Sequence, residues 1–303
     1  MSGAHVPVMV DEVLELLDPV PGACVVDGTV GLGGHAERIA ERIGPSGCLI
    51  GIDRDREALK RAARRLERFG NRVQLVHARL SFLRDAVAGS GRSHVDGVLL
   101  DLGVCSIHLD TPERGFSFRA DGPLDMRLDP SAGETAAELL SRLTADQLAG
   151  VLRDGGVPNP RRLATALKHH QPIDTTRQLA DAVRSVPQRR RRHHPATLVF
   201  QALRIAVNDE FGELETGLVA ALDSLRPGGR LAVLSYHSGE DRRVKRFLAE
   251  EERGCICPPE MPVCGCGRQA RVRRIGRGRA PSSSEIGRNP RARSARLRGA
   301  ERC

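Results

Sequence analysis

A glycine turn that follows an acid is the feature of this sequence best suited to chemistry. Residues 24–35 read CVVDGTVGLGGH, an apolar segment that reaches Asp27 and runs into a turn containing Gly33 and Gly34. Glycine lets the backbone approach a ligand closely, and an acid about 20 residues later suits the hydroxyls of a ribose. Asp53 ends the apolar segment CLIGID at that spacing. The pattern predicts a cradle for a nucleoside cofactor.

Asp27 indicates which cofactor the cradle binds. A dinucleotide would place its pyrophosphate at this turn, where a carboxylate repels it. S-adenosylmethionine has no phosphate and carries ammonium and sulfonium charges, so an acid at the end of the first strand favours it. We therefore expect S-adenosylmethionine, with a nicotinamide-dependent oxidoreductase as the competing function. The alternative role for Asp27 is that of a buried carboxylate that only caps the turn.

Asp101 is the candidate for the transfer step, because it ends the apolar segment VDGVLLD. Methyl transfer from a sulfonium depends on alignment and needs no metal. An exocyclic amine becomes positively charged as it attacks, and a carboxylate that accepts its hydrogen bond stabilises that charge. Asp101 is therefore predicted to lie nearest the acceptor amine. Its alternative role is a strand-end acid that caps a helix.

Residues 235–241, SYHSGED, follow a late apolar segment and add two further candidates. Tyr236 is predicted to lie against a base that has left its stack to enter the site. His237 is predicted to order the loop or to relay a proton. A purely structural hydrogen-bonding role is the alternative for this histidine.

Four cysteines form a C-x-C-x6-C-x-C pattern: Cys255, Cys257, Cys264 and Cys266. Four thiolates at this spacing could bind zinc tetrahedrally, and thiols without a metal are the alternative. No metal is expected at the methyl-transfer site. The sequence shows no export signal and no long apolar span, so its eight cysteines indicate the reducing cytosol and no membrane partner.

The positive charge is concentrated near the C-terminus. The net charge is +9, and residues 253–303 alone hold 13 arginines against three acids, a balance of +10. Such a block favours a polyanionic partner. Aromatic residues make up 3% of the chain, which argues against rows of stacked bases. Recognition of a nucleic acid would then rest on backbone charge, shape and one captured base. The run QRRRRHHP at 188–195 is either a solvated loop or an RNA contact.

The spacing of apolar segments predicts a parallel sheet interrupted by a helical insertion. Strand-like segments alternate at first with helical stretches such as residues 56–69, and they lie at 24–29, 48–53, 72–77, 95–102 and 229–235. Between 107 and 203 only helix signals occur: capping boxes at Thr144 with Gln147 and at Thr175 with Gln178, and Pro160 in a first turn. Within this part, residues 111–130 could be a lid, a binding loop or a plain connector.

Nine segments, in order and over nearly the whole chain, resemble the ribosomal RNA small subunit methyltransferase H family. They are HVPVMVDEVL, DGTVGLGGH, GIDRD, DLGVCS, LDTPERGFSFRADGPLDMRLDP, HPATLVFQALRIAVNDE, GGRLAVLSYHS, GCICPPEMPVCGCG and NPRARSARLR. The resemblance implies an α/β fold, a class I (Rossmann-like) methyltransferase sheet with an inserted all-helical domain. Residues 1–108 and 204–303 would bind S-adenosylmethionine, and residues 109–203 would recognise RNA. The implied reaction is N4 methylation of one cytidine in the decoding region of 16S ribosomal RNA, within the small ribosomal subunit in the cytoplasm.

The same resemblance implies the cofactor contacts, which fall on Gly33, Gly34, His35, Asp53, Leu80, Asp101 and His108. Five positions depart from the family pattern. Leu80 stands where phenylalanine is usual, His108 where glutamine is common, and Cys105 in place of a serine before Ser106. In SYHSGED, Tyr236 replaces a phenylalanine and Gly239 a leucine, and the segment VPNPRRLATAL fits the helical domain of the family poorly. These differences leave two alternatives open, a divergent copy that acts on another RNA cytidine and a noncatalytic RNA-binding or ribosome assembly factor. The sequence does not indicate an oligomeric state.

Overall fold

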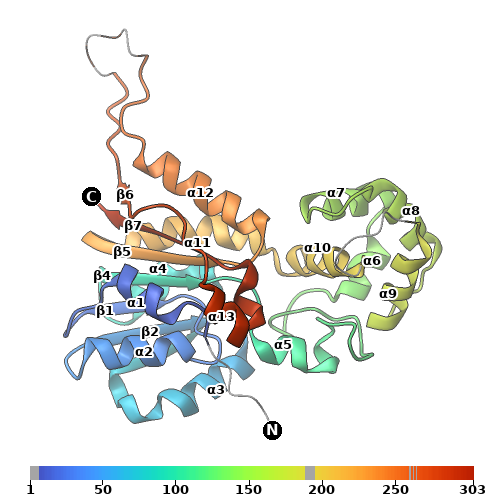
Figure 1. The fold of residues 1–303 in the computed structure, drawn as a ribbon, viewed down its shortest axis with the longest axis horizontal. Coiled ribbons are helices and arrows are strands. Elements are labelled where there is room, and N and C mark those ends of the chain that lie inside the picture. The colour runs from blue at the N-terminus through green and yellow to red at the C-terminus, as the bar shows by residue number, and fades with distance from the viewer. Residues whose placement is uncertain (1–6, 188–194, 259–260, 262, 264) are drawn as a thin grey trace. The chain divides into compact units, whose positions relative to one another are not determined.

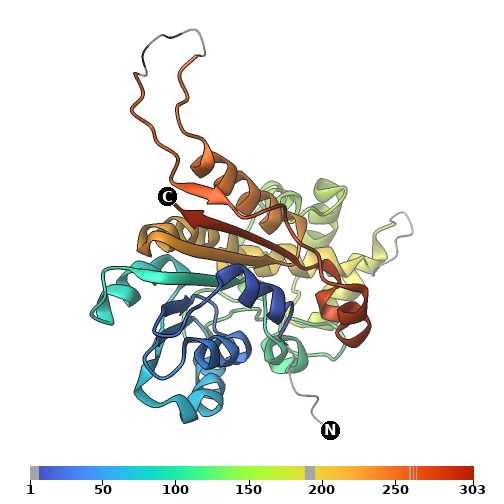
Figure 2. The same ribbon diagram turned by 60° about the vertical axis from the view of Figure 1, so that its left-hand side comes forward.

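The computed structural model describes residues 7–187, 195–258, 261, 263 and 265–303 (Figures 1 and 2). The chain forms two compact units, Met1–Gly103 with Glu213–Cys303, and Val104–Gly212. The first unit contains the sheet. In the described part of the second unit, the regular elements are helices.

The first unit contains one seven-stranded sheet with the order β3-β2-β1-β4-β5-β7-β6. Its strands are β1 Cys24–Asp27, β2 Cys48–Asp53, β3 Val73–His77, β4 Val95–Asp101, β5 Leu225–Ser235, β6 Val272–Arg274 and β7 Arg296–Arg302. The first five are parallel, and β7 runs antiparallel between β5 and β6. The predicted α/β fold with a class I methyltransferase sheet is confirmed. The order reverses between β1 and β4, and ligands bind at such a reversal.

Helices cover both faces of this sheet, which explains the apolar runs in its strands. Alternate strand residues point to opposite faces, so Val25 and Leu99 pack in one core while Val26 and Val98 pack in the other. The first core includes α1 Val10–Leu17, α2 Gly34–Ile43 and α3 Arg56–Leu66. The second includes α4 Leu83–Gly89, α11 Glu210–Ser224 and α12 Ser238–Glu252. A firm two-sided core therefore fixes the strand ends that carry the candidate site.

The strands β6 and β7 were not predicted, and they explain much of the basic C-terminal block. The guanidinium of Arg298 pairs with the Asp241 carboxylate at 2.7 Å and 3.0 Å. Arg273 and Arg279 pair with Glu301 and Glu15 at 2.8 Å and 2.9 Å. Part of the predicted basic surface is thus neutralised, because its arginines attach the C-terminal strands to acids of the same unit.

The second unit is built from six helices in its described part: α5 Ser106–Asp110, α6 Ala136–Arg142, α7 Ala145–Asp154, α8 Pro160–His169, α9 Thr176–Ser185 and α10 Ala196–Asn208. The predicted capping boxes begin α7 and α9, and Pro160 begins α8. A third box, Thr135 with Glu138, begins α6 and was missed. The charge run at 188–194 lies outside the described residues.

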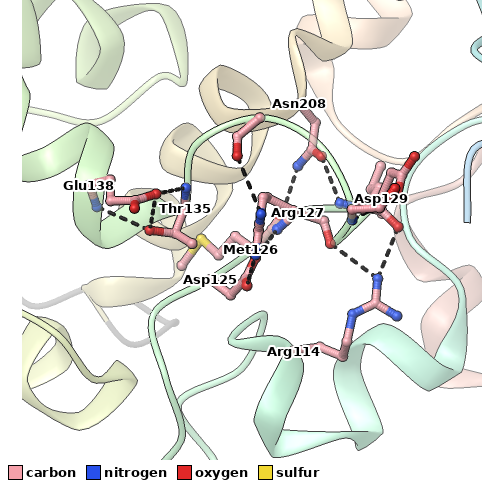
Figure 3. A network of polar contacts seen from close by, with 11 residues as sticks. Arg114, Asp125, Met126, Arg127, Asp129, Thr135, Glu138 and Asn208 are labelled. Carbon is pink, nitrogen blue, oxygen red and sulfur yellow. Dashed lines mark hydrogen bonds and ion pairs between the residues drawn. The ribbon is translucent and has the colours of Figure 1, made fainter.

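The segment 111–130 is packed into the second unit, as Figure 3 shows. Its side chains Phe116, Leu124, Met126 and Leu128 are buried. The amide of Asn208 donates to the Met126 carbonyl and accepts from the Leu128 N–H, both at 2.8 Å. Arg114 donates to the carbonyls of Arg127 and Leu128 at 3.1 Å and 3.0 Å. The segment is therefore part of the helical core.

Short helical turns complete the fold. They are α13 Ser283–Arg288 and the 3₁₀ turns η1 Glu67–Arg72, η2 Leu80–Phe82, η3 Pro112–Arg114 and η4 Pro290–Ser294. No helix in the described ranges is long and apolar enough to cross a membrane.

Candidate active site

Three carboxylates lie at the carboxyl edge of neighbouring parallel strands. Asp27, Asp53 and Asp101 end β1, β2 and β4, and β1 pairs with both of the others. The charges of Asp101 and Asp53 both raise the pKa of Asp27, which places the three within electrostatic reach of one another. This acidic edge lies at the point where the strand order reverses.

The glycine turn connects the end of β1 to α2 and reaches across to β2. The Gly31 N–H donates to the Asp53 carboxylate at 2.8 Å, and the Asp55 N–H donates to its other oxygen at 2.8 Å. Gly33 adopts a φ of 78°, a left-handed conformation that favours glycine, and α2 begins at Gly34. Asp53 is thus held directly beside the turn, as the predicted cradle requires.

Leu80 packs beside the same turn. A Cβ atom on Gly28 would lie 2.7 Å from Leu100 Cδ2 and 3.0 Å from Leu80 Cδ1, so the strand end can hold only glycine without a shift. The structure therefore brings Leu80 to the cradle. Its contact with a cofactor stays a prediction.

The Asp101 carboxylate is fixed by two side chains from other elements. The Tyr236 hydroxyl donates to Oδ1 at 2.7 Å, and His35 Nδ1 lies 3.3 Å from Oδ2. The Asp101 N–H donates to Thr29 Oγ1 at 2.6 Å. Because 24% of the Asp101 side chain is exposed, the oriented carboxylate remains accessible from solvent. Each oxygen can accept a second hydrogen bond.

His35 is buried between two acceptors. Its Nε2 lies 2.8 Å from the Val8 carbonyl, which can only accept, so this nitrogen carries a proton. Burial lowers the pKa of His35, but the hydrogen bond and charge of Asp101, the charge of Asp27 and the Val8 carbonyl outweigh it, and the pKa is raised. The Asp101 carboxylate and the Val8 carbonyl therefore both favour the protonated form of His35.

Asp27 is buried at 1% exposure and accepts the Thr29 N–H at 3.2 Å. Burial raises the pKa of Asp27 to about 7, and the charge of His35 and the Thr29 hydrogen bond offset part of that effect. The turn-capping contact that the sequence offered as an alternative is present. The carboxylate also titrates close to neutral pH, which makes its charge sensitive to a bound cation.

Tyr236 keeps its proton at all ordinary pH values. Burial raises the pKa of Tyr236 well above 10, and the charge of Asp101 and the hydrogen bond to it raise it further. The ring packs against the core that contains α1 and α2. The phenol therefore acts as a hydrogen-bond donor to Asp101.

His237 caps the start of α12 together with a residue that the sequence reading missed. Its Nδ1 accepts the N–H groups of Gly239 and Glu240 at 3.2 Å and 3.4 Å. Glu240 is buried and accepts the Tyr236 and His237 N–H groups at 2.8 Å and 3.3 Å. Because Nδ1 accepts, the ring proton lies on Nε2, 3.2 Å from Glu240 Oε1. The His-x-x-Glu spacing of a capping box was the signal for Glu240.

His108 belongs to the second unit, whereas the residues described above belong to the first. The Cys105 N–H donates to His108 Nδ1 at 3.2 Å, which caps α5. The imidazole is 4% exposed, and its centroid lies 5.0 Å from that of Phe116. Its predicted contact with the cofactor stays a prediction.

The cysteine motif lies in the loop between α12 and β6. The sulfur atoms of Cys255, Cys257 and Cys266 lie within 4.8 Å of one another. The fourth predicted ligand, Cys264, is outside the described residues.

Comparison with known proteins agrees with this arrangement. The family model described as MraW methylase family matches residues 2–303. The chain is 51% identical over 309 aligned residues to the ribosomal RNA small subunit methyltransferase H of Syntrophotalea carbinolica, covering 98% of each chain. It is 48% identical over 307 residues to the protein of that name in Pelobacter propionicus, again covering 98% of each. The predicted resemblance is thereby confirmed. With its sheet, its acidic strand ends and these matches, the chain belongs to the MraW methylase family, and it is a methyltransferase.

Proposed function

We propose that this methyltransferase transfers a methyl group from S-adenosylmethionine to the N4 amine of a cytidine in small-subunit ribosomal RNA. The observation that carries the choice of donor is the acidic edge of Asp27, Asp53 and Asp101, with His35 among them. Such an edge attracts the ammonium and sulfonium charges of the donor and repels a pyrophosphate. The relatives named above carry the RNA assignment.

The donor binds along the glycine turn. Gly33 and Gly34 allow its close approach, and Asp53, already oriented by the Gly31 N–H, accepts hydrogen bonds from the ribose hydroxyls. Leu80 contributes an apolar surface for the adenine. His108 is proposed as a further contact from the second unit.

Asp101 accepts a hydrogen bond from the cytidine amine. The amine nitrogen attacks the methyl carbon, the carbon–sulfur bond breaks, and its electron pair stays on sulfur, which becomes a neutral thioether. The nitrogen becomes positively charged during attack, and one of its protons afterwards passes to solvent water. A fixed carboxylate stabilises that charge without having to reorganise.

His35, Tyr236 and His237 position this carboxylate and its surroundings. Tyr236 and His35 each contact one oxygen of Asp101. His237 fixes the loop that carries Tyr236, through the hydrogen bonds with Glu240. A proton relay through His237 is disfavoured, because its Nδ1 already accepts two N–H groups.

The RNA contacts come from two regions. Arg288, Arg293 and Arg296 are exposed, and Arg296 pairs in register with Ser235, the residue before Tyr236. This places positive charge at the strand edge that carries Asp101. Residues 109–203 of the inserted helical part recognise the RNA substrate, which is 16S ribosomal RNA within the small subunit, in the cytoplasm. DNA and membranes are not partners in this proposal.

The proposal is tested by the Asp101→Asn variant in a methyl-transfer assay with purified small subunits and with free 16S RNA. We expect kcat to fall by about 100-fold or more, because the variant removes the charge that stabilises the attacking amine. Asp146→Asn, an exposed acid at the start of α7, is the matched control. Unchanged turnover in Asp101→Asn would remove this residue from the mechanism.

Two measurements separate the alternatives. Mass spectrometry of ribosomal RNA from cells with and without the protein is expected to show the loss of one N4-methylcytidine, and loss at another cytidine would indicate a divergent copy. Calorimetry is expected to show binding of S-adenosylmethionine and not of NAD. Donor binding without any methyl transfer to RNA would favour a noncatalytic assembly factor.

A further inference from the structure

The loop of residues 253–271 joins α12 to β6 and has no helix or strand in its described part. Its base is closed where the Arg271 N–H donates to the Glu251 carbonyl at 2.8 Å and the two side chains pair at 3.2 Å. Figures 1 and 2 show its two arms running side by side away from the sheet. Loops longer than about 12–15 residues without secondary structure are uncommon in compact domains and need a source of order.

Apolar packing does not supply that order in the described part of the loop. Its large apolar side chains are exposed, with Ile256 at 54%, Met261 at 48% and Val263 at 75%. The described part of the loop therefore gains little stability from apolar burial.

The sulfur atoms of the cysteine motif provide such a contact. Cys255 and Cys257 lie on the outgoing arm and Cys266 on the returning arm, with all three sulfurs within 4.8 Å of one another. The Cys255 and Cys266 sulfurs are 3.7 Å apart. A disulfide requires about 2 Å, whereas a tetrahedral zinc ion with Zn–S bonds of about 2.3 Å places its sulfurs about 3.8 Å apart. The observed separation matches an edge of that tetrahedron.

The electrostatic surroundings also suit thiolates. The Cys257 N–H donates to Cys255 Sγ at 3.4 Å, the kind of outer hydrogen bond that stabilises a metal-bound sulfur. Arg253 and Arg268 add positive charge to the same loop. Thiolate clusters select zinc over hard cations such as Mg²⁺ and Ca²⁺.

We propose that Cys255, Cys257 and Cys266 bind a structural zinc ion that joins the two arms of this loop. Each thiol releases its proton to solvent as its sulfur binds the ion. The described residues supply three ligands. A structural zinc ion takes four ligands in all.

The first test measures the metal content of the whole protein, purified with a reductant and without chelators. We expect about one zinc ion per chain. The variants Cys255→Ser, Cys257→Ser and Cys266→Ser are each expected to lower the zinc affinity by about tenfold or more. Cys303→Ser, another exposed cysteine, is the matched control and is expected to keep its zinc.

A second test uses cobalt as a spectroscopic probe. Metal-free protein titrated with Co²⁺ is expected to develop the visible and sulfur charge-transfer bands of a tetrahedral thiolate site, and Cys266→Ser is expected to lose them. Limited proteolysis is expected to cut the loop in metal-free protein while the sheet resists. The proposal fails if the reduced native protein takes up neither metal. It fails equally if Cys303→Ser loses as much zinc as the motif variants.

Discussion

At the residue scale, the site is a carboxylate held by two neighbouring side chains. The Tyr236 hydroxyl donates to one oxygen of Asp101, and His35 Nδ1 lies 3.3 Å from the other, so the carboxylate is oriented from two sides. Both contacts leave the carboxylate able to bind a substrate, since each oxygen can accept another hydrogen bond. This arrangement prepares Asp101 for a charge that exists only during transfer.

The titration of Tyr236 offers a direct check on this contact. The chain contains one tyrosine and no tryptophan, so the ultraviolet absorbance of tyrosinate reports on Tyr236 alone. Because burial and the Asp101 charge raise its pKa, we expect ionisation only well above pH 10. In Asp101→Asn the charge is removed, and we expect the midpoint to fall while burial keeps it above the ordinary value. An identical midpoint in both proteins would contradict the contact.

Asp27 predicts a pH dependence of donor binding. Burial raises its pKa to about 7 in the folded protein, so protonated Asp27 stabilises the fold at low pH and this contribution is lost as the pH rises towards 7. A cationic donor prefers the ionised form. We expect the affinity for S-adenosylmethionine, measured by calorimetry, to increase between about pH 6 and 8, by at most about tenfold per unit.

Asp27→Asn is expected to remove this slope. It is also expected to remove the loss of thermal stability that Asp27 causes as the pH rises from about 4 to about 7. Asp53→Asn serves as the control. It is expected to weaken donor binding at every pH and to keep the slope. A slope that persists in Asp27→Asn would assign the titration to another group.

The acids of the site could be predicted from the sequence, and their partners could not. Asp27, Asp53 and Asp101 each end an apolar run, and the carboxyl ends of parallel strands meet at one edge. The Val8 carbonyl that faces His35 lies 27 residues away in the chain. Such a contact arises from the packing of α1 against α2, which no local pattern encodes. Glu240 could have been predicted from the sequence, because its spacing from His237 is that of a capping box.

At the scale of the element, the glycine turn depends on close packing as well as on backbone conformation. Gly28 follows β1, where Leu80 and Leu100 fill the space that a side chain would need. The same packing brings Leu80 to the cofactor cradle. Stability and donor binding are therefore coupled at this position.

The Gly28→Ala variant tests that coupling. Its Cβ would lie 2.7 Å from Leu100 and 3.0 Å from Leu80, so we expect a loss of about 1–3 kcal/mol in the free energy of unfolding. We also expect weaker binding of S-adenosylmethionine, because Leu80 must move. Gly89→Ala, in α4 with open space around it, is the control and is expected to change stability by less than about 1 kcal/mol. Chemical denaturation and calorimetry measure both effects, and an unchanged donor affinity in Gly28→Ala would separate Leu80 from the cradle.

Prediction of the strands succeeded best where the strand is apolar and buried. Strands β1, β2 and β4 are largely buried apolar runs. All five parallel strands lie within four residues of their expected bounds. The strand β7 reads RLRGAER, with Leu297 and Ala300 buried among arginines. Its arginines are tolerated in the sheet because acids such as Asp241 neutralise them. A hydrophobic pattern cannot reveal a strand that depends on ion pairs.

At the scale of the whole molecule, the arginines divide into two groups. Some, such as Arg298 and Arg279, join the C-terminal strands to acids of the same unit. Others, Arg288, Arg293 and Arg296, are exposed, and Arg296 pairs in register with Ser235, the residue before Tyr236. Only the second group is proposed to contact RNA.

Replacing Arg288, Arg293 and Arg296 together by alanine is expected to weaken binding to 16S RNA by about tenfold or more at moderate salt. The logarithm of the RNA association constant decreases linearly with the logarithm of the salt concentration. The steepness of that decrease is expected to be smaller by about two, since each lost phosphate contact removes roughly 0.7–0.9. Binding of S-adenosylmethionine is expected to stay unchanged. Arg61, Arg64 and Arg84 on α3 and α4, replaced together, are the charge-matched control. An equal loss of RNA affinity in both triple variants would indicate that the arginines attract RNA only through the net charge of the protein.

The position of β7 has a consequence for biosynthesis. It lies between β5 and β6, although both of these precede it in the chain. While a ribosome is still translating the codons before Arg296, the exposed margin of β5 has no neighbour on that side, and β6 has nothing to pair with. Nascent chains at this stage expose the unpaired backbone N–H and C=O groups of an edge strand, which can pair with another chain and cause aggregation. Premature termination just upstream of Arg296 would thus cost the protein two strands at once.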